Sequence, residues 1–462
     1  MWSPETLDPA GPRYLAVADA IARDVESGRL AAGARLPPQR DLAARLGVDP
    51  TTVTRAYTEA RRRGLIAGHV GRGTFVRGGA DPGDAAGEGE QAEVVDLSLN
   101  YPPRATSALA AEAMAEALRA LRRVDLLEEL LQYQPHAGRV SHRAAGAAWV
   151  RRRGMEADAG RISVCSGGQH ALGVLLATLL QTGDRVACEE LTYPGFRGVA
   201  ELLGVPLAPL PLDAEGIRPD AFADVCRSGG VSMLYCVPTA QNPTTATMSV
   251  ARRREIAGIA REHGVRIVED DIYGALLSDA PPALSSFAPE LGYFVSSLSK
   301  ALAPGLRIAY LLAPTERDAE RLLATIRLTV WMAPPLTAEV AARWITGGAA
   351  DRLLAANRAA ARERQALAAR LLAPYSPAAH PEAFHLWLPL PAPWDPTAFA
   401  LQARLRGVVV SPASAFALRG AAVPSAVRLS LSAPATMAPL QRALEILAAL
   451  LAGGPTEGVA VL

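Results

Sequence analysis

The stretch SLSKALAPGLR, residues 297–307, contains Lys300, which is the only lysine in a chain of 462 residues. Lysine and arginine together number 47, so every other basic side chain of this kind is an arginine. Arginine suits any site that needs only positive charge, but it does not lose its proton near neutral pH, whereas a buried lysine can act as a nucleophilic amine. Lys300 therefore indicates a site that uses a nucleophilic amine. The alternative is that it is an ordinary surface lysine in a chain that otherwise favours arginine.

Groups able to bind a dianion surround this lysine. The hydroxyls of Ser297 and Ser299 and the guanidinium of Arg307 bracket it, and such groups form charge-assisted hydrogen bonds with phosphate. In the segment SGGQHALG, Gly168 and Gln169 lie where a strand gives way to a helix, and backbone N–H groups at a helix start bind anions. A tight strand-to-helix turn would explain these glycines equally well if they stood alone.

Strand-like and helix-like segments alternate through this part of the chain. We predict strands at 162–165, 185–188, 233–237, 266–269, 293–296 and 306–311, and helices at 168–180, 195–203 and 250–263. Such alternation is typical of an α/β domain with a mostly parallel sheet flanked by helices. Ligands of such sheets bind at the carboxyl ends of the strands, where the residues named above fall.

The segment from about 95 to 450 resembles the fold-type I pyridoxal 5'-phosphate (PLP) enzymes of the aspartate aminotransferase superfamily. The resemblance implies that Lys300 forms the Schiff base, that Asp270 in VEDDIYG keeps the pyridine nitrogen protonated, and that Tyr193 stacks on the ring. It further implies that PLP is held by Gly168, Gln169, Tyr193, Asn242, Asp270, Tyr273, Ser297, Ser299, Lys300 and Arg307. An aspartate at the ring nitrogen makes the ring an electron sink.

Two more matches to this family concern assembly and ligand. Tyr133 in LLQYQPHAG resembles the tyrosine that reaches the cofactor phosphate of a partner subunit, which implies a homodimer. Arg428 in VRLSLSA resembles the arginine that binds both oxygens of a substrate carboxylate. Taken singly, these residues have plainer explanations: a helix cap at Asp270, a turn at Asn242, and a strand-edge surface position for Arg428.

A tract without large apolar side chains, GGADPGDAAGEGEQAE at 78–93, divides the chain. It cannot offset the entropy of ordering by burial, so we predict a flexible linker at 79–94, against the alternative of an ordered surface loop. The linker separates an N-terminal domain, 1–78, from an aminotransferase-like domain, 95–455. Within the latter we expect a large subdomain at about 140–330 and a smaller C-terminal α+β subdomain at about 335–455.

The N-terminal domain has the pattern of a winged helix-turn-helix. Apolar residues recur at helical spacing from Tyr14 to Val25, a short helix is expected from 39 to 46, and a third begins at Pro50 or Thr51. A small hairpin follows around residues 68–73. Residues 1–78 contain 12 arginines against 8 acidic residues, an excess of four positive charges that suits DNA.

The stretch LPPQRDLAARLGVDPTTVTRAYTEARRRGLIAGHVGRGTFV resembles the GntR family of bacterial transcription regulators. In that family the third helix enters the major groove and the wing reaches the minor groove. Asp49-Pro50 departs from the pattern, because relatives often have a polar residue followed by a basic one at these positions, and an acid near phosphate argues against direct base contacts there. The resemblance implies DNA contacts by Arg40, Thr51, Thr52, Thr54, Arg55, His69, Arg72, Gly73 and Thr74.

Joined by a linker, these two parts resemble the MocR-type regulators. The resemblance implies a PLP-dependent, DNA-binding transcriptional regulator that binds a double-stranded operator and senses an amino acid or amine by aldimine exchange at Lys300. The alternative is an active aminotransferase that carries a regulatory DNA-binding head, since no group needed for transamination is missing. Slow formation of a stable adduct would favour sensing, and steady conversion to a keto acid would favour catalysis.

Composition sets the remaining expectations. The formal net charge is only +1, so a nucleic-acid partner must be met by a local patch. The four cysteines have no CxxC spacing, no signal peptide is evident at the N-terminus, and no apolar run approaches the roughly 18 residues of a membrane helix. We therefore expect a cytoplasmic protein with no membrane partner and no metal site.

Overall fold

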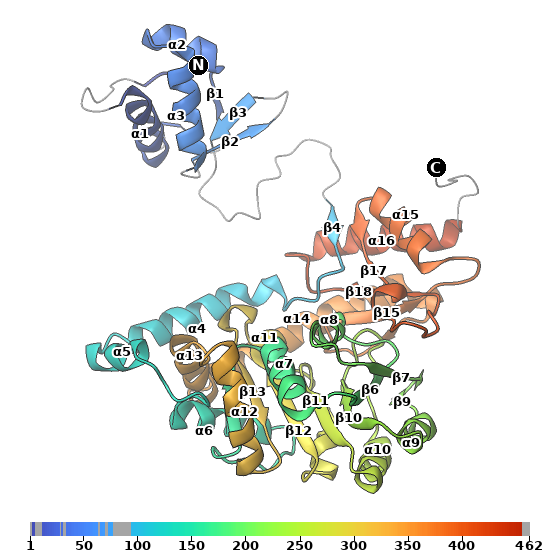
Figure 1. The fold of residues 1–462 in the computed structure, drawn as a ribbon. Helices are drawn as coiled ribbons and strands as arrows, with labels where there is room; N and C mark the ends of the chain where they lie inside the picture. Colours follow the sequence, from blue (N-terminus) through green and yellow to red (C-terminus); the bar gives the residue numbers. More distant parts are fainter. Residues whose placement is uncertain are drawn as a thin grey trace. The chain divides into compact units, whose positions relative to one another are not determined.

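The computed structural model describes residues 2–4, 12–27, 29–30, 34–62, 65–69, 73–76 and 94–454. The chain divides into two compact units, Met1–Glu93 and Val94–Leu462, each drawn in Figure 1. Except for Val94, the predicted linker lies outside the described residues, and so does Arg72.

The first unit contains three helices and a small sheet. The helices are α1 (Arg13–Glu26), α2 (Gln39–Leu46) and α3 (Pro50–Arg62), and the strands are β1 (Arg35–Leu36), β2 (Ile66–His69) and β3 (Gly73–Val76). The antiparallel order β1-β3-β2 confirms the predicted hairpin and adds β1, which the sequence pattern did not indicate. Apolar side chains of all three helices are fully buried together, including Val17, Leu42 and Val53.

The second unit is built on a seven-stranded sheet. Its strands are β5 (Ile162–Cys165), β6 (Arg185–Glu189), β7 (Leu207–Leu210), β10 (Val231–Cys236), β11 (Arg266–Asp270), β12 (Gly292–Ser297) and β13 (Ala309–Leu312). The order is β5-β13-β12-β11-β10-β6-β7, and every pair is parallel except the two that involve β13. The predicted mostly parallel α/β sheet is therefore confirmed. The strand expected to begin at Leu306 begins at Ala309, because residues 304–306 form a 3-10 turn that ends at Arg307 with φ 52°.

Helices cover both faces of this sheet (Figure 1). Alternate strand residues point to opposite faces: Val186 and Met233 lie in the core that includes α7, whereas Ala187 and Leu234 lie in the core that includes α9 and α10. The helices of this region are α4 (Ser107–Ala120), α5 (Val124–Leu131), α6 (Val140–Arg151), α7 (Gly168–Leu179), α8 (Pro194–Leu202), α9 (Pro219–Arg227), α10 (Val250–His263), α11 (Leu298–Ala301), α12 (Glu316–Thr329), α13 (Pro335–Thr346) and α14 (Ala349–Leu371). A short hairpin of two strands with two residues each, β8 (Leu212–Asp213) and β9 (Gly216–Ile217), lies between β7 and α9 in the chain.

A smaller lobe follows in the chain. Its antiparallel sheet has the order β14-β15-β18-β17, formed by Ala378–Ala379, His385–Pro389, Ala426–Ser430 and Ser411–Pro412, and it carries helices α15 (Pro396–Leu405) and α16 (Met437–Gly453). The first strand of the unit, β4 (Val95–Asp96), pairs in parallel with β16 (Val408–Val409) of this lobe. None of the described helices combines the length and apolar character needed to cross a bilayer.

Candidate cofactor and ligand site

A cavity of about 390 Å³ lies where the carboxyl ends of β10, β11 and β12 meet the smaller lobe. Six residues predicted for the cofactor or its ligand line it: Tyr193, Asn242, Asp270, Tyr273, Lys300 and Arg428. The rest of the lining is Ser98, Leu99, Asn100, Tyr101, Pro194, Val237, Ile272, Ser411, Ala415 and Phe416. The topology therefore gathers residues that are more than 200 positions apart in the chain.

Lys300 lies in the short helix α11, directly after β12. Its Nζ donates to the carbonyl of Asn100 and lies 5.7 Å from the centre of the Tyr101 ring. Burial lowers the pKa of Lys300 to about 8, and the positive charges of Arg428 and Arg307 contribute to the same shift. Near neutral pH a useful fraction of this amine is therefore unprotonated, as a nucleophile requires.

Asp270 ends β11 and is 4% exposed. The Tyr235 hydroxyl donates to its Oδ2 at 3.0 Å, and within the described residues its buried Oδ1 has no hydrogen-bond partner. Burial raises the pKa of Asp270 to about 7, although the bond from Tyr235 opposes the shift. A buried acceptor without a partner is costly, and a protonated pyridine nitrogen is a donor of the right kind, so this carboxylate fits PLP.

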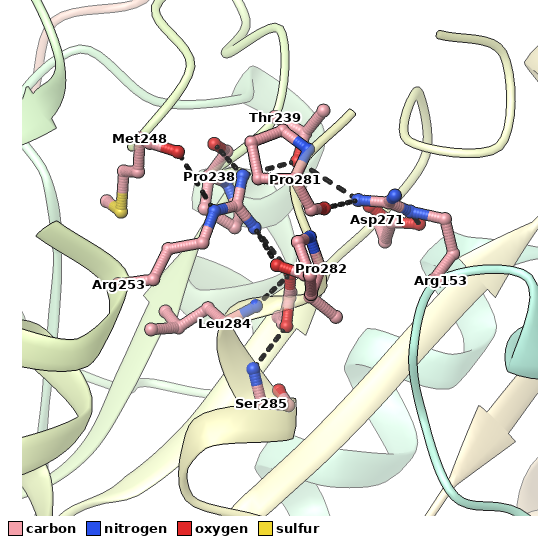
Figure 2. A network of polar contacts seen from close by, with 12 residues as sticks. Arg153, Pro238, Thr239, Met248, Arg253, Asp271, Pro281, Pro282, Leu284 and Ser285 are labelled. Atoms are coloured by element: carbon pink, nitrogen blue, oxygen red, sulfur yellow. Dashed lines mark hydrogen bonds and ion pairs between the residues drawn. The ribbon is translucent and has the colours of Figure 1, made fainter. Parts of the chain in front are cut away.

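A buried polar network holds the neighbours of Asp270 (Figure 2). Arg153 Nε donates to Asp271 Oδ2 at 2.9 Å, and Arg253 Nη1 lies 3.6 Å from Glu269 Oε1. Both arginines also donate to the Thr239 hydroxyl, Arg253 at 2.7 Å and Arg153 at 3.5 Å. The two carboxylates that flank Asp270 are thus paired, so each buried charge on its flanks has an opposite charge beside it.

The phosphate-binding residues predicted from the sequence meet at the start of α7. Gly167 precedes this helix at φ 88°, and no side chain caps the helix N-terminus. A Cβ on Gly167 would lie 2.6 Å from Arg307 Nη2, and one on Gly168 would lie 3.4 Å from the Cβ of Ser297. Arg307 and Ser297 therefore face the free N–H groups of α7 across a space that side chains would fill, which is a cradle suited to an anion.

Hydrogen bonds position the serines and Gln169 around this cradle. The Ser297 hydroxyl donates to the Ser299 hydroxyl at 3.2 Å and accepts from the Ser299 N–H at 3.3 Å. Tyr193 donates to Gln169 Oε1 at 3.1 Å, and Gln169 Nε2 donates to the Gly195 carbonyl at 3.0 Å. The predicted phosphate ligands of this chain therefore lie around the start of α7: Gly168 and Gln169 belong to that helix, Ser297 and Ser299 lie at the start of α11, and Arg307 lies beside Gly167.

Arg428 comes from β18 of the smaller lobe and is 6% exposed. Its Nη1 donates to Asn242 Oδ1 at 2.8 Å, and its Nη2 donates to the Ser98 carbonyl. Its guanidinium lies 4.8 Å from the centre of the Phe416 ring, and among the described residues its Nε has no hydrogen-bond partner. A planar cation in a buried site with a free donor is suited to a carboxylate.

Sequence reasoning missed Asn100 and His385. Asn100 Nδ2 donates to the Tyr273 hydroxyl at 2.8 Å and lies 3.3 Å from Nδ1 of His385, whose Nε2 lies 3.0 Å from the Gln241 carbonyl. A carbonyl only accepts, so Nε2 of His385 carries the proton and Nδ1 accepts. Burial lowers the pKa of His385 to about 3, which agrees with a neutral ring. A lone Asn or His in the sequence gives no signal of such contacts.

Tyr133 is 80% exposed and does not line the cavity. Its ring lies 5.6 Å from that of Trp331, which is itself 46% exposed. The single chain thus places this tyrosine on the surface, away from Lys300, and the predicted role towards a partner subunit stays a prediction.

In the first unit, Arg40, Thr51, Thr54 and Arg55 are exposed and Thr52 and Thr74 are half-buried. The Arg55 guanidinium lies 4.3 Å from the centre of the Tyr14 ring, and the Thr54 hydroxyl donates to Gln39 at 2.8 Å. His69 ends β2 and Gly73 begins β3, so their backbones belong to the wing. The side chains of these two residues, like Arg72, lie outside the described part.

Asp49 and Pro50 have a structural reason for departing from the GntR pattern. Asp49 Oδ1 accepts from the N–H of Thr51 at 2.8 Å and from its hydroxyl at 2.5 Å. These bonds lower the pKa of Asp49. An aspartate at the N-cap followed by proline in the first turn is a favoured way to begin a helix, so the acid serves α3.

Comparisons with known proteins agree with both units. The family model "Aminotransferase class I and II" matches residues 92–447, and the model "Bacterial regulatory proteins, gntR family" matches residues 13–76. The chain is a MocR-type GntR regulator with an aminotransferase class I and II domain. An HTH-type transcriptional regulator of Bacillus subtilis, YdeF, is 31% identical over 97% of this chain and 96% of its own length.

Two further proteins are similar to this chain over most of its length. The vitamin B6 salvage pathway transcriptional repressor PtsJ of Salmonella typhimurium is 28% identical over 90% of this chain and 93% of its own length. Among solved structures, LysN, an α-aminoadipate aminotransferase from Thermus thermophilus complexed with N-(5'-phosphopyridoxyl)-L-leucine, covers 78% of this chain and 92% of its own, with a TM-score of 0.69 and 24% identity. At that identity the likeness shows the fold alone.

Proposed function

We propose that this regulator binds PLP at Lys300, senses a primary amine that carries a carboxylate, and changes its binding to operator DNA in response. The observation that carries the proposal is that the only lysine in the chain lines a cavity that it shares with Asp270 and Arg428. The name of PtsJ, a transcriptional repressor of the vitamin B6 salvage pathway, and the phosphopyridoxyl amino acid in complex with LysN support the same cofactor.

The residues present fit two parts of that cofactor, its phosphate and its ring nitrogen. The free N–H groups of α7, with Ser297 and Arg307, suit its phosphate, and Oδ1 of Asp270 lacks the donor that a ring nitrogen would supply. When bound, PLP supplies an aldehyde for which primary amines compete, joined to an electron-withdrawing ring. Tyr273, whose oxygen accepts from Asn100, keeps its own O–H hydrogen for a donor role towards the cavity.

Arg428 selects the ligand in this proposal. Its free Nε and its Nη2 lie on one edge of the guanidinium, and that edge can hold two carboxylate oxygens at once. An amino acid would therefore bind better than the amine that lacks its carboxylate. Such a ligand affects DNA binding only if it interacts differently with two conformations of the chain. The proposed assembly is a homodimer, with Tyr133 directed to the partner's cofactor.

Absorbance spectroscopy tests the site. Purified full-length chain with added PLP is expected to show a visible absorption band, and borohydride reduction is expected to fix the cofactor mass on the peptide that contains Lys300. Lys300→Ala should abolish both, whereas Lys300→Arg tests whether charge alone suffices. A colourless protein, or an adduct elsewhere in the chain, would contradict the proposal.

The regulator and the aminotransferase alternatives are separated by the fate of the amino acid. Each of the twenty protein amino acids is added to the PLP-loaded chain, and the band and any keto acid are followed over one turnover. A lasting spectral shift without keto acid supports sensing, whereas one equivalent of keto acid from the loaded chain, with continued release once a second keto acid is added to accept the amino group, supports catalysis. DNA duplexes selected from a random pool then show whether the same amino acid alters DNA affinity.

A further inference from the structure

The first segment of the second unit enters through the smaller lobe. After β4 pairs with β16, Leu97, which is fully buried, donates its N–H to the Val409 carbonyl at 2.8 Å and accepts from the Ser430 N–H at 2.8 Å. Asp96 Oδ1 then accepts from the N–H and the hydroxyl of Ser98 at 2.7 and 2.6 Å. The chain that follows the predicted linker is thus anchored to the smaller lobe up to Ser98.

Residues Ser98–Tyr101 line the cavity, and we call them the strap. The Ser98 carbonyl accepts from Arg428 Nη2, and the Asn100 carbonyl accepts from Lys300 Nζ. The Tyr101 carbonyl accepts from the hydroxyl of Ser432. The side-chain amide of Asn100 donates to Tyr273 of the larger lobe. The strap therefore joins both lobes through the same side chains that the proposed cofactor and ligand need.

We propose that the strap is the element that reports occupancy of the site to the DNA-binding unit, because a ligand carboxylate must compete with the Ser98 carbonyl for Arg428. The inference rests on the proposed function. A carboxylate forms charge-assisted bonds that are roughly twice as strong as those of a neutral carbonyl. It therefore takes Nη2 from Ser98, while Asn242 keeps Nη1.

The second carbonyl responds to the state of Lys300. Asn100 accepts from Nζ of Lys300 only while that amine keeps its hydrogens, so binding of the cofactor at Nζ weakens this contact. An amino acid that takes the place of Lys300 on the cofactor frees Nζ to donate to Asn100 again, and its carboxylate takes Arg428 from Ser98, which keeps the longer contact from the Ser411 hydroxyl at 3.4 Å. The Tyr101 carbonyl keeps its donor, Ser432, in both states.

The strap lies close to the predicted linker in sequence, because only residues 95–97 separate it from the linker's end at Val94. Residues 95–97 are held by β16 and β18, so a released strap changes the chain immediately after its last anchor in the smaller lobe. A carboxylate-free amine leaves the contact between Arg428 and Ser98 in place. Amino acids and matched amines should therefore differ in their effect on the strap even when both bind.

Hydrogen exchange of the full-length chain tests the strap. With PLP bound, an amino acid that shifts the visible spectrum is expected to speed exchange in the 98–102 peptide about tenfold, the factor for a loss of about 1.4 kcal/mol. Its carboxylate-free amine should have a smaller effect. Arg428→Gln should speed exchange without any ligand, because it removes the donor to Ser98 directly.

Ser432→Ala and Ser425→Ala form a matched pair of variants. Each removes a serine hydroxyl that donates to a backbone carbonyl, of Tyr101 and of Trp394 respectively, but only the first touches the strap. Ser432→Ala is expected to leave the cofactor band unchanged and to alter the response of DNA affinity to the amino acid, whereas Ser425→Ala should alter neither.

Failure of the strap and failure of the proposed function give different results. Unchanged exchange at 98–102 in both the amino-acid and the Arg428→Gln experiments, with a normal cofactor band and a normal spectral response, overturns the strap alone. A chain that forms no band with PLP overturns both proposals.

Discussion

Replacing Arg253 by methionine is expected to lower the free energy of unfolding of the second unit by about 4 kcal/mol, since breaking a buried ion pair costs about 3–5 kcal/mol. Arg253 is fully buried. It donates to the carbonyls of Met248, Pro238 and Pro282 at 3.0, 2.7 and 3.2 Å and to the Thr239 hydroxyl at 2.7 Å, as Figure 2 shows. Methionine fills much of the volume but satisfies none of these acceptors, and it leaves Glu269 facing an apolar side chain.

Urea titration of the full-length chain measures the effect, with the fluorescence of the buried Trp149 and Trp344 reporting the second unit. Arg261→Met is the matched control, because its pair with Glu290 is half-exposed on both sides and is worth no more than about 1 kcal/mol. The double variant Arg253→Met/Glu269→Gln should lose about 2 kcal/mol less unfolding free energy than the two single variants lose together. Equal losses for Arg253→Met and Arg261→Met would refute the reasoning.

Further predictions concern pH, the anion cradle and DNA. Because the pKa of Lys300 is lowered to about 8, the rate of PLP capture should rise with pH and level off above about 8, as stopped-flow absorbance can show; a rise that continues to pH 10 contradicts it. Burial raises the pKa of Glu189 from 4.5 to about 8, so the folded state binds more protons than the unfolded state between those values, and stability falls as pH rises through this window. Glu189→Gln should flatten that fall in urea midpoints compared at pH 5.5 and 7.5. Gly167→Ala should weaken PLP binding at least tenfold by equilibrium titration, because the new Cβ would lie 2.6 Å from a guanidinium, whereas Gly173→Ala, with its nearest contact at 3.7 Å, should not. Arg40→Ala should reduce the slope of log affinity against log salt by about one if this exposed side chain contacts phosphate; an unchanged slope would remove it from the interface.

Much of the fold follows from local pattern. The expected helix at 250–263 has the bounds of α10, and α2 has the expected bounds of 39–46, because apolar spacing and end signals lie within one segment. β1 was missed because two residues carry no periodicity, and its pairing with β3 is set by tertiary contact. The late start of β13 has a similar origin, since the left-handed backbone at Arg307 depends on the turn before it.

The candidate site was predictable only where chemistry limits the residue type. A lysine in an arginine-rich chain stands out from the sequence alone. Asn100, His385 and Tyr235 do not, because each acts through a partner at least 35 positions away. The pairing of Arg153 and Arg253 with the carboxylates beside Asp270 is equally invisible, since a charged residue on a helix, or in the turn that ends one, is ordinarily expected to be exposed to solvent.

The parallel pairing of β4 with β16 sets a limit on how this protein can be divided. Trimming the N-terminus to Tyr101, to obtain the aminotransferase-like part by itself, would delete Val95 and Leu97, which are 5% and 0% exposed, and would leave their apolar neighbours open to water. Lys300 and Arg428 would lose their carbonyl acceptors in the same cut. A fragment that keeps its native binding behaviour must therefore start no later than Val95, at the very end of the segment that composition alone marks as a linker.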